Sequence, residues 1–115
     1  MKLIFKITMI LVVLISCEEP TEIIRHAPEI HGIFFSRSAI YPNEFVDVTA
    51  NVTDEDKGDK LTYNWQTTCG HFNNTINNPT QWFAPSYPAT CTISLTVSDG
   101  YFEVSKSAEI IVLKP

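Results

Sequence analysis

Basic residues are scarce in this sequence. The chain of 115 residues contains 8 Lys and Arg against 13 Asp and Glu, which gives a formal net charge of −5 at pH 7. Proteins that bind nucleic acid or anionic lipid headgroups place clusters of Lys and Arg beside the phosphates, and no such cluster occurs along the chain. We therefore expect no nucleic-acid partner.

Residue patterns that support catalysis are lacking as well. The three histidines, His26, His31 and His71, are spread over the chain and show no His-x-x-x-His spacing of the kind that binds zinc. No paired carboxylates and no histidine-activated nucleophile are recognisable in the sequence. We expect a protein that is not an enzyme, in which each histidine is an ordinary surface or partly buried residue.

The sequence also lacks an apolar run long enough to cross a bilayer, which takes about 20 residues. Residues 7–15 form a shorter run that follows two lysines and ends at Leu14-Ile15-Ser16-Cys17. This order resembles the lipobox of bacterial lipoproteins, in which the cysteine is lipidated and becomes the new N-terminus. We interpret residues 1–16 as a lipoprotein signal peptide and Cys17 as the lipidation site, with an ordinary secretory signal as the alternative.

Residues 17–27 are polar and acidic, and Pro20 interrupts them, so we expect an extended tether between lipid and domain. Glu18 and Glu19 directly after the cysteine resemble the sorting signals that send some lipoproteins to the outer membrane. A solvated linker accounts for them equally well. The resemblance implies an exported protein that is anchored to the cell envelope by its lipid. The outer membrane is the expected location.

Only two cysteines remain once Cys17 is assigned to the anchor. Cys69 and Cys91 form an even pair in a chain expected to reach an oxidising compartment, and the alternation of nearby apolar residues allows both to point inward. We predict a disulfide, which stabilises the domain by about 3 kcal/mol for a loop of this length. A redox or metal-binding pair is the alternative, but it lacks the Cys-x-x-Cys spacing.

Alternating apolar and polar residues dominate the rest of the chain, and no amphipathic helix is evident after residue 16. We expect residues 59–65 to form the central strand, with Leu61, Tyr63 and Trp65 on its buried face. The other expected strands are residues 30–35, 45–52, 80–84, 90–98 and 102–113, with a short edge segment within residues 72–79. Seven such segments favour an all-β sandwich of two sheets.

An acidic turn precedes the expected central strand. Residues 53–59 concentrate carboxylates, but they do not fit the calcium loop of an EF-hand, which needs glycine at the sixth and glutamate at the twelfth position. Asp54, Asp56 and Asp59 remain weak calcium candidates. The alternative is a solvated turn in which Gly58 supplies an unusual φ and the aspartates accept hydrogen bonds from neighbouring amides. We therefore expect no cofactor, with calcium as the exception to test.

Several of these segments occur in a recognisable order. The turn at residues 52–54, the run at residues 58–65, Trp82 to Pro85, and residues 93–100 together resemble the PKD-type, immunoglobulin-like modules of extracellular proteins. The resemblance covers residues 45–113 and implies an immunoglobulin-like (PKD-type) two-sheet sandwich of about seven antiparallel strands, and we expect the whole domain to span residues 28–115. It also implies a non-catalytic module that presents, spaces or binds, and it brings the end of the Leu61 strand beside the start of the Cys91 strand.

Three functions fit this reading. The first is a lipid-anchored envelope domain that mediates protein–protein interaction, adhesion or complex assembly. The second is a carbohydrate-binding surface lipoprotein that uses exposed aromatic residues, for which Phe83, Tyr87 and Tyr101 are the candidates because we expect Trp82 in the core. The third is a structural spacer that calcium stabilises. The expected partners are the membrane, through Cys17, and either an envelope protein or a surface glycan.

Overall fold

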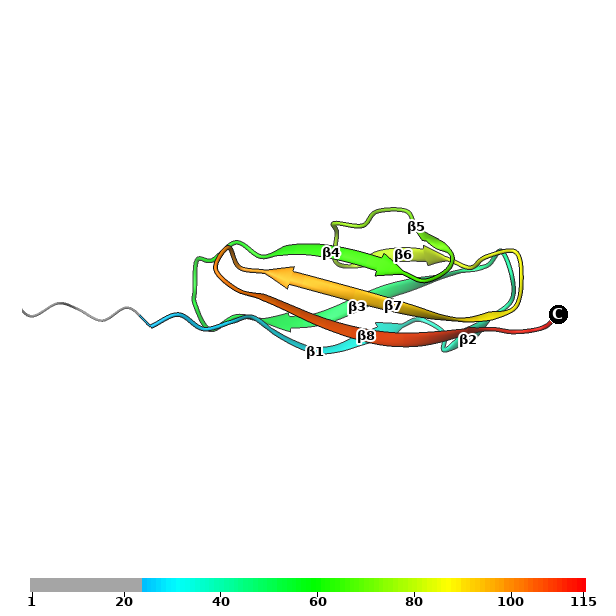
Figure 1. Cartoon of the computed structure of the whole chain (residues 1–115), viewed down its shortest axis with the longest axis horizontal. Coiled ribbons are helices and arrows are strands. Elements are labelled where there is room, and N and C mark those ends of the chain that lie inside the picture. The colour runs from blue at the N-terminus through cyan, green and yellow to red at the C-terminus, as the bar shows by residue number, and fades with distance from the viewer. Residues whose placement is uncertain (1–23) are drawn as a thin grey trace, which may run out of the picture.

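The computed structural model describes residues 24–115 of the chain (Figure 1). The predicted signal peptide, Cys17 and the first part of the predicted tether lie outside the described residues. The described part contains eight strands and no helix, and therefore no helix that is able to cross a membrane. The strands are β1 (Glu29–Phe35), β2 (Ala39–Ile40), β3 (Phe45–Thr53), β4 (Thr62–Thr67), β5 (His71–Phe72), β6 (Thr80–Phe83), β7 (Ala89–Ser98) and β8 (Glu103–Val112).

The strands form two facing sheets of four. One sheet has the order β1-β3-β6-β5, which we call sheet A, and the other has the order β2-β8-β7-β4, which we call sheet B (Figure 1). The predicted two-sheet all-β architecture is therefore confirmed. The prediction of about seven antiparallel strands is also confirmed, because seven of the eight strands have antiparallel partners, and only the additional strand β2 pairs in parallel, with β8. This strand has only two residues, too few for a pattern of alternation to reveal.

Side chains from alternate positions of β3 and β7 fill the space between the sheets. Val46, Val48 and Ala50 of β3 are buried, and the residues between them are exposed, as a strand with one solvated face requires. On β7 the buried positions are Cys91, Ile93, Leu95 and Val97. Each large apolar side chain that is fully buried stabilises the fold by about 1.5–3 kcal/mol.

The strand around Trp65 lies at an edge. Trp65 is 1% exposed and belongs to the core, but β4 pairs only with β7 and stands at the end of sheet B. The prediction of a central strand is therefore wrong. Alternation reports which face of a strand is buried, and it does not report how many strands pair with it. The central strands of sheet B are β7 and β8.

Residues 73–79 cover the free edge of β4. The backbone N–H of Trp65 donates a hydrogen bond of 2.8 Å to the Thr75 carbonyl. The side chain of Asn78 bonds both the N–H and the C=O of Ala50 on β3, so this segment is also attached to sheet A. The segment therefore bridges the two sheets and protects an edge that would otherwise be open to pairing.

A disulfide joins Cys69, which follows β4, to Cys91 of β7, with a Cα–Cα distance of 5.4 Å. The antiparallel register of β4 and β7, in which Thr67 lies opposite Ile93, brings the two cysteines together. Cys91 is fully buried. The predicted disulfide is confirmed.

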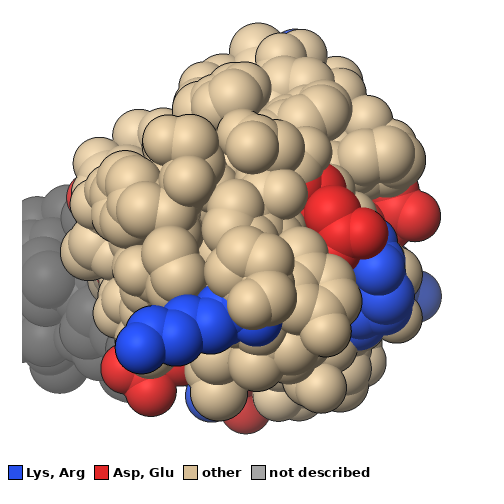
Figure 2. Space-filling model, turned by 90° about the vertical axis from the view of Figure 1, so that its right-hand side faces the viewer, with Lys and Arg blue, Asp and Glu red and all other residues tan. Residues whose placement is uncertain are grey.

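The loops gather at the two ends of the sandwich (Figure 1). Residue 24 enters at the end formed by the β3–β4 loop and the β7–β8 turn, which we call the near end. The turn at residues 41–44, the β6–β7 loop at residues 84–88 and the C-terminus lie at the opposite end, which we call the far end. Viewed onto the far end, most of the surface is neither acidic nor basic (Figure 2).

Candidate functional site

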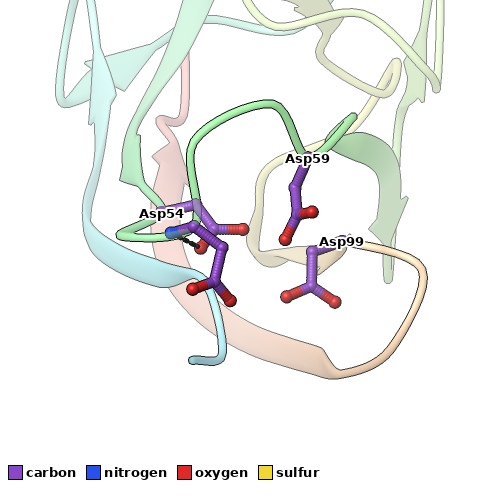
Figure 3. A group of neighbouring side chains, drawn as sticks. Asp54, Asp59 and Asp99 are labelled. Carbon is purple, nitrogen blue, oxygen red and sulfur yellow. Dashed lines mark hydrogen bonds between the residues drawn. The ribbon is translucent and has the colours of Figure 1, made fainter. Parts of the chain in front are cut away.

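Four aspartates converge at the near end. Asp54, Asp56 and Asp59 come from the β3–β4 loop, and Asp99 comes from the β7–β8 turn, 40 residues after Asp59 in the sequence. The four residues each offer one carboxylate oxygen, and these oxygens lie within 4.8 Å of one another. Figure 3 shows the side chains of Asp54, Asp59 and Asp99 gathered close together at this end. We call this group the four-aspartate cluster.

Local hydrogen bonds hold two of these side chains in place. One oxygen of Asp99 accepts hydrogen bonds from the N–H groups of Tyr101 (2.8 Å) and Phe102 (2.7 Å), which closes the β7–β8 turn. One oxygen of Asp54 accepts a hydrogen bond from the Asp56 N–H at 3.0 Å. In both cases one oxygen builds the loop and leaves the second oxygen free to face the cluster.

The second oxygens are buried without a partner. Oδ2 of Asp54, Asp59 and Asp99 is inaccessible to solvent and accepts no hydrogen bond from any described residue. Asp99 as a whole is only 5% exposed. A buried carboxylate oxygen that lacks a hydrogen bond or a counter-charge is costly, and here three such oxygens belong to residues of one cluster. This arrangement is the strongest sign of a ligand in the described part of the chain.

Residues just before β1 contact the fourth aspartate. The backbone N–H of His26 donates a 2.7 Å hydrogen bond to Asp56 Oδ2, and its ring Nδ1 lies 3.1 Å from Oδ1. These hydrogen bonds lower the pKa of Asp56. The contact with Asp56, with the nearby charge of Glu55, raises the pKa of His26. One carboxylate therefore belongs both to the cluster and to the attachment of the N-terminal segment.

The electrostatics of the cluster favour a cation. Burial, followed by the charges of Asp54, Asp56 and Asp99, raises the pKa of Asp59. No Lys or Arg among residues 24–115 forms an ion pair with the four aspartates. Calcium binds oxygen at about 2.3–2.6 Å, so ligands on opposite sides of one ion lie about 5 Å apart. The spread of 4.8 Å therefore suits a single calcium ion.

The structure extends the sequence-based calcium hypothesis by one residue. Asp54, Asp56 and Asp59 were candidates from the sequence, and all three lie in the cluster. Asp99 is not recognisable as a ligand in the sequence, because the pair Asp99-Gly100 is typical of a hairpin turn and that turn accounts for the residue without a ligand. The alternative of a solvated turn is correct about Gly58, whose φ is positive (91°) as expected. It does not account for Oδ2 of Asp54 and Asp59, because these two oxygens are buried and accept no hydrogen bond.

The candidate aromatic residues do not form one surface. Tyr101 lies at the near end, where the Arg25 guanidinium stands 3.6 Å over its ring. Tyr87 lies in the loop at the far end and is 54% exposed. Phe83 lies on the outer face of sheet A, while its neighbour Trp82 is fully buried as expected. Tyr87 and Tyr101 therefore lie beyond opposite ends of β7 and do not share one surface.

Comparison with known proteins gives a likeness of fold. No family model matches the sequence, and no curated protein matches it. The solved structure of the D00-D0 domain of Intimin is similar, with a TM-score of 0.60 and 9% sequence identity. The match covers 81% of this chain and 50% of that chain, so this chain spans about half the length of the Intimin structure. Together with its two four-stranded sheets, the likeness shows that the chain is an immunoglobulin-like β-sandwich.

Proposed function

We propose that this chain is an exported, non-catalytic module of the cell envelope that calcium stabilises at its near end and that contacts a partner elsewhere on its surface. The observation that carries the proposal is the four-aspartate cluster with its three buried, unpartnered oxygens. PKD-type membership and lipidation at Cys17 belong to this proposal, and they rest on the sequence motifs alone.

Asp54, Asp56, Asp59 and Asp99 would hold the ion, each through a carboxylate oxygen. Calcium supplies two positive charges, which offset the repulsion between these carboxylates, and it prefers such hard oxygen ligands. It would also connect the β3–β4 loop to the β7–β8 turn, two loops that lie far apart in sequence. The role of these residues is therefore to fix the near end, where the predicted tether enters.

A role in adhesion or assembly rests on three observations. Residue 24 lies at the near end, and the far end, with its mostly uncharged surface, lies at the opposite end of the sandwich (Figures 1 and 2). Large apolar side chains such as Tyr41 and Tyr87 are exposed there. The disulfide fits an oxidising compartment outside the cytoplasm. A partner at the far end is therefore the expected contact.

Thermal unfolding with calcium chloride and with a chelator tests the calcium part. The wild type should unfold at a higher temperature with calcium, since a ligand at 100 times its Kd stabilises the folded state by about 2.7 kcal/mol. Asp99→Asn should lose most of this stabilisation while its Oδ1 still accepts the turn hydrogen bonds. Glu109→Gln removes an exposed charge on β8 and serves as the matched control. Equal melting temperatures with and without calcium would remove the calcium site.

A pull-down from detergent-solubilised envelope tests the contact. We expect Tyr87→Ala at the far end to reduce capture of a specific partner, whereas Tyr101→Ala at the near end should not. The two substitutions remove the same side chain at similar exposures of 54% and 58% from opposite ends of the sandwich, and Tyr101→Ala also removes the contact with Arg25. Equal losses in both variants, or no specific partner at all, would contradict a far-end contact.

A further inference from the structure

Sheet A carries a row of three rings across its outer face. Phe45 of β3, Phe83 of β6 and His71 of β5 are register partners. The ring centroids of Phe45 and Phe83 are 5.5 Å apart, and the His71 ring stacks on Phe83 at 5.1 Å with an interplanar angle of 7°. Phe45 is 47% exposed. The row therefore presents apolar ring surface to solvent without belonging to the core.

A polar row runs beside the aromatic row on the same face. Asp47 and Gln81 are register partners, and each lies two residues along its strand from Phe45 or Phe83. The Gln81 amide donates a 3.1 Å hydrogen bond to Asp47 Oδ1. Asn73 donates in turn to Gln81 Oε1 at 3.3 Å. The three planar side chains are thus ordered by one another, with further donors and acceptors of their groups available to a ligand.

This polar row forms part of an open hollow of about 450 Å³. Its lining includes Asp47, Thr49, Asn73, Asn77, Pro79 and Gln81. Its wall is the segment 73–79, which hydrogen bonds to Trp65 and Ala50 hold against both sheets. A site built on fixed elements loses little entropy when it binds a ligand.

The chemistry of the hollow selects among ligands. Amide, hydroxyl and carboxylate groups match the hydroxyl groups of a sugar, and the neighbouring rings match its apolar C–H face. Asp47 is the only charged residue in the lining, which contains no Lys or Arg to neutralise an acidic ligand. Strand addition by a protein is disfavoured here, because β5 on this edge has only two residues.

We propose that the outer face of sheet A binds a neutral oligosaccharide, with its hydroxyl groups on Asp47, Gln81 and the segment 73–79 and a sugar ring against Phe45 and Phe83. This proposal goes beyond the function proposed above and does not depend on the calcium site. It gives a role to Phe83, and it leaves Tyr87 and Tyr101 outside the sugar site.

Nuclear magnetic resonance titration of the full chain, carrying Cys17→Ala to remove the predicted lipid site, provides the test. The probes are chitotetraose, cellotetraose and maltotetraose at millimolar concentration. Binding of at least one should shift the amide signals of β3, β6 and residues 73–79. Phe45→Ala should weaken it about five- to tenfold through loss of ring contact. Gln81→Leu, which keeps the size and removes the amide, should also weaken it.

Ile111→Ala is the matched control, because Ile111 is 49% exposed on the opposite sheet and should leave binding unchanged. Asp99→Asn should also bind normally, so failure of the calcium site and failure of the sugar site are distinguishable. The proposal is overturned if none of the three oligosaccharides binds, if Phe45→Ala and Gln81→Leu bind as the wild type does, or if the shifts map to another face. Capture of a protein on this face without sugar binding would overturn it as well.

Discussion

The indole Nε1 of Trp65 donates a 2.7 Å hydrogen bond to the backbone carbonyl of Asn77. Trp65 therefore fills the core from β4 and also fastens the segment that covers the edge of β4. Replacing it with Ala should lower the free energy of unfolding by about 3–5 kcal/mol, because a large buried ring is lost. Trp65→Phe should cost less, about 1–3 kcal/mol for the unpaired carbonyl together with the smaller ring. Urea unfolding measures both, and a loss below 1 kcal/mol for Trp65→Ala would contradict the burial.

Gly70 stands where a side chain has no room. Its φ is +74°, and a Cβ at this position would lie 2.6 Å from the Trp82 ring. Gly70→Ala should therefore destabilise the fold by clearly more than the roughly 1–2 kcal/mol that a positive φ alone costs an L residue. Gly100→Ala is the control, because φ there is +93° but a Cβ would have no atom within 4 Å beyond its two chain neighbours. Equal losses in the two variants, measured by denaturant unfolding, would remove the steric explanation.

The disulfide closes a loop with a sequence separation of 22 residues. On the chain-entropy model its removal should lower the free energy of unfolding by about 3 kcal/mol. Comparing the wild type with Cys69→Ser/Cys91→Ser measures this loss. Mass spectrometry of the non-reduced, exported chain should find neither thiol free. Two free thiols would contradict the bond.

Asp59→Asn should change stability in opposite directions with and without calcium. In chelator, the variant removes a charge that three neighbouring aspartates repel, so it should unfold at a higher temperature than the wild type. With calcium, it loses a ligand, so the order should reverse. A pair of melting curves in each buffer checks this prediction. A variant that is less stable than the wild type in both buffers would indicate that Asp59 has a purely structural role.

The predicted anchor lies outside the described residues and needs its own test. Growth with a radiolabelled lipid precursor should label the wild type and leave Cys17→Ala unlabelled, with the variant released from the membrane fraction. If both chains are labelled, or neither is, the lipobox interpretation is wrong. Cys69→Ser/Cys91→Ser should still be labelled, because its anchor cysteine is intact.

The sequence predicted those features that depend on the residues of a single strand. Alternation on β3 and β7 identified their buried faces, and the odd positions of Cys69 and Cys91 were consistent with a bond. It could not reveal that β4 is an edge strand, because pairing depends on strands elsewhere in the chain. The parallel contact of β2 with β8 involves too few residues to leave a pattern.

The candidate sites show the same division. Three ligands of the four-aspartate cluster are close in sequence and were candidates, whereas Asp99 joins them only through the fold. The row of Phe45, Phe83 and His71 likewise depends on the pairing of three strands. One signal for Asp99 was present in the sequence. Carboxylates directly follow both long strands, β3 and β7, and these two strands end at the same end of the sandwich.

The segment 73–79 limits how the proposed sugar face can change. Because the same residues seal the edge of β4 and wall the hollow, an insertion there would expose backbone groups that invite pairing with a second molecule. New specificity would therefore arise by exchanging side chains on β3 and β6, while the length of this segment stays fixed.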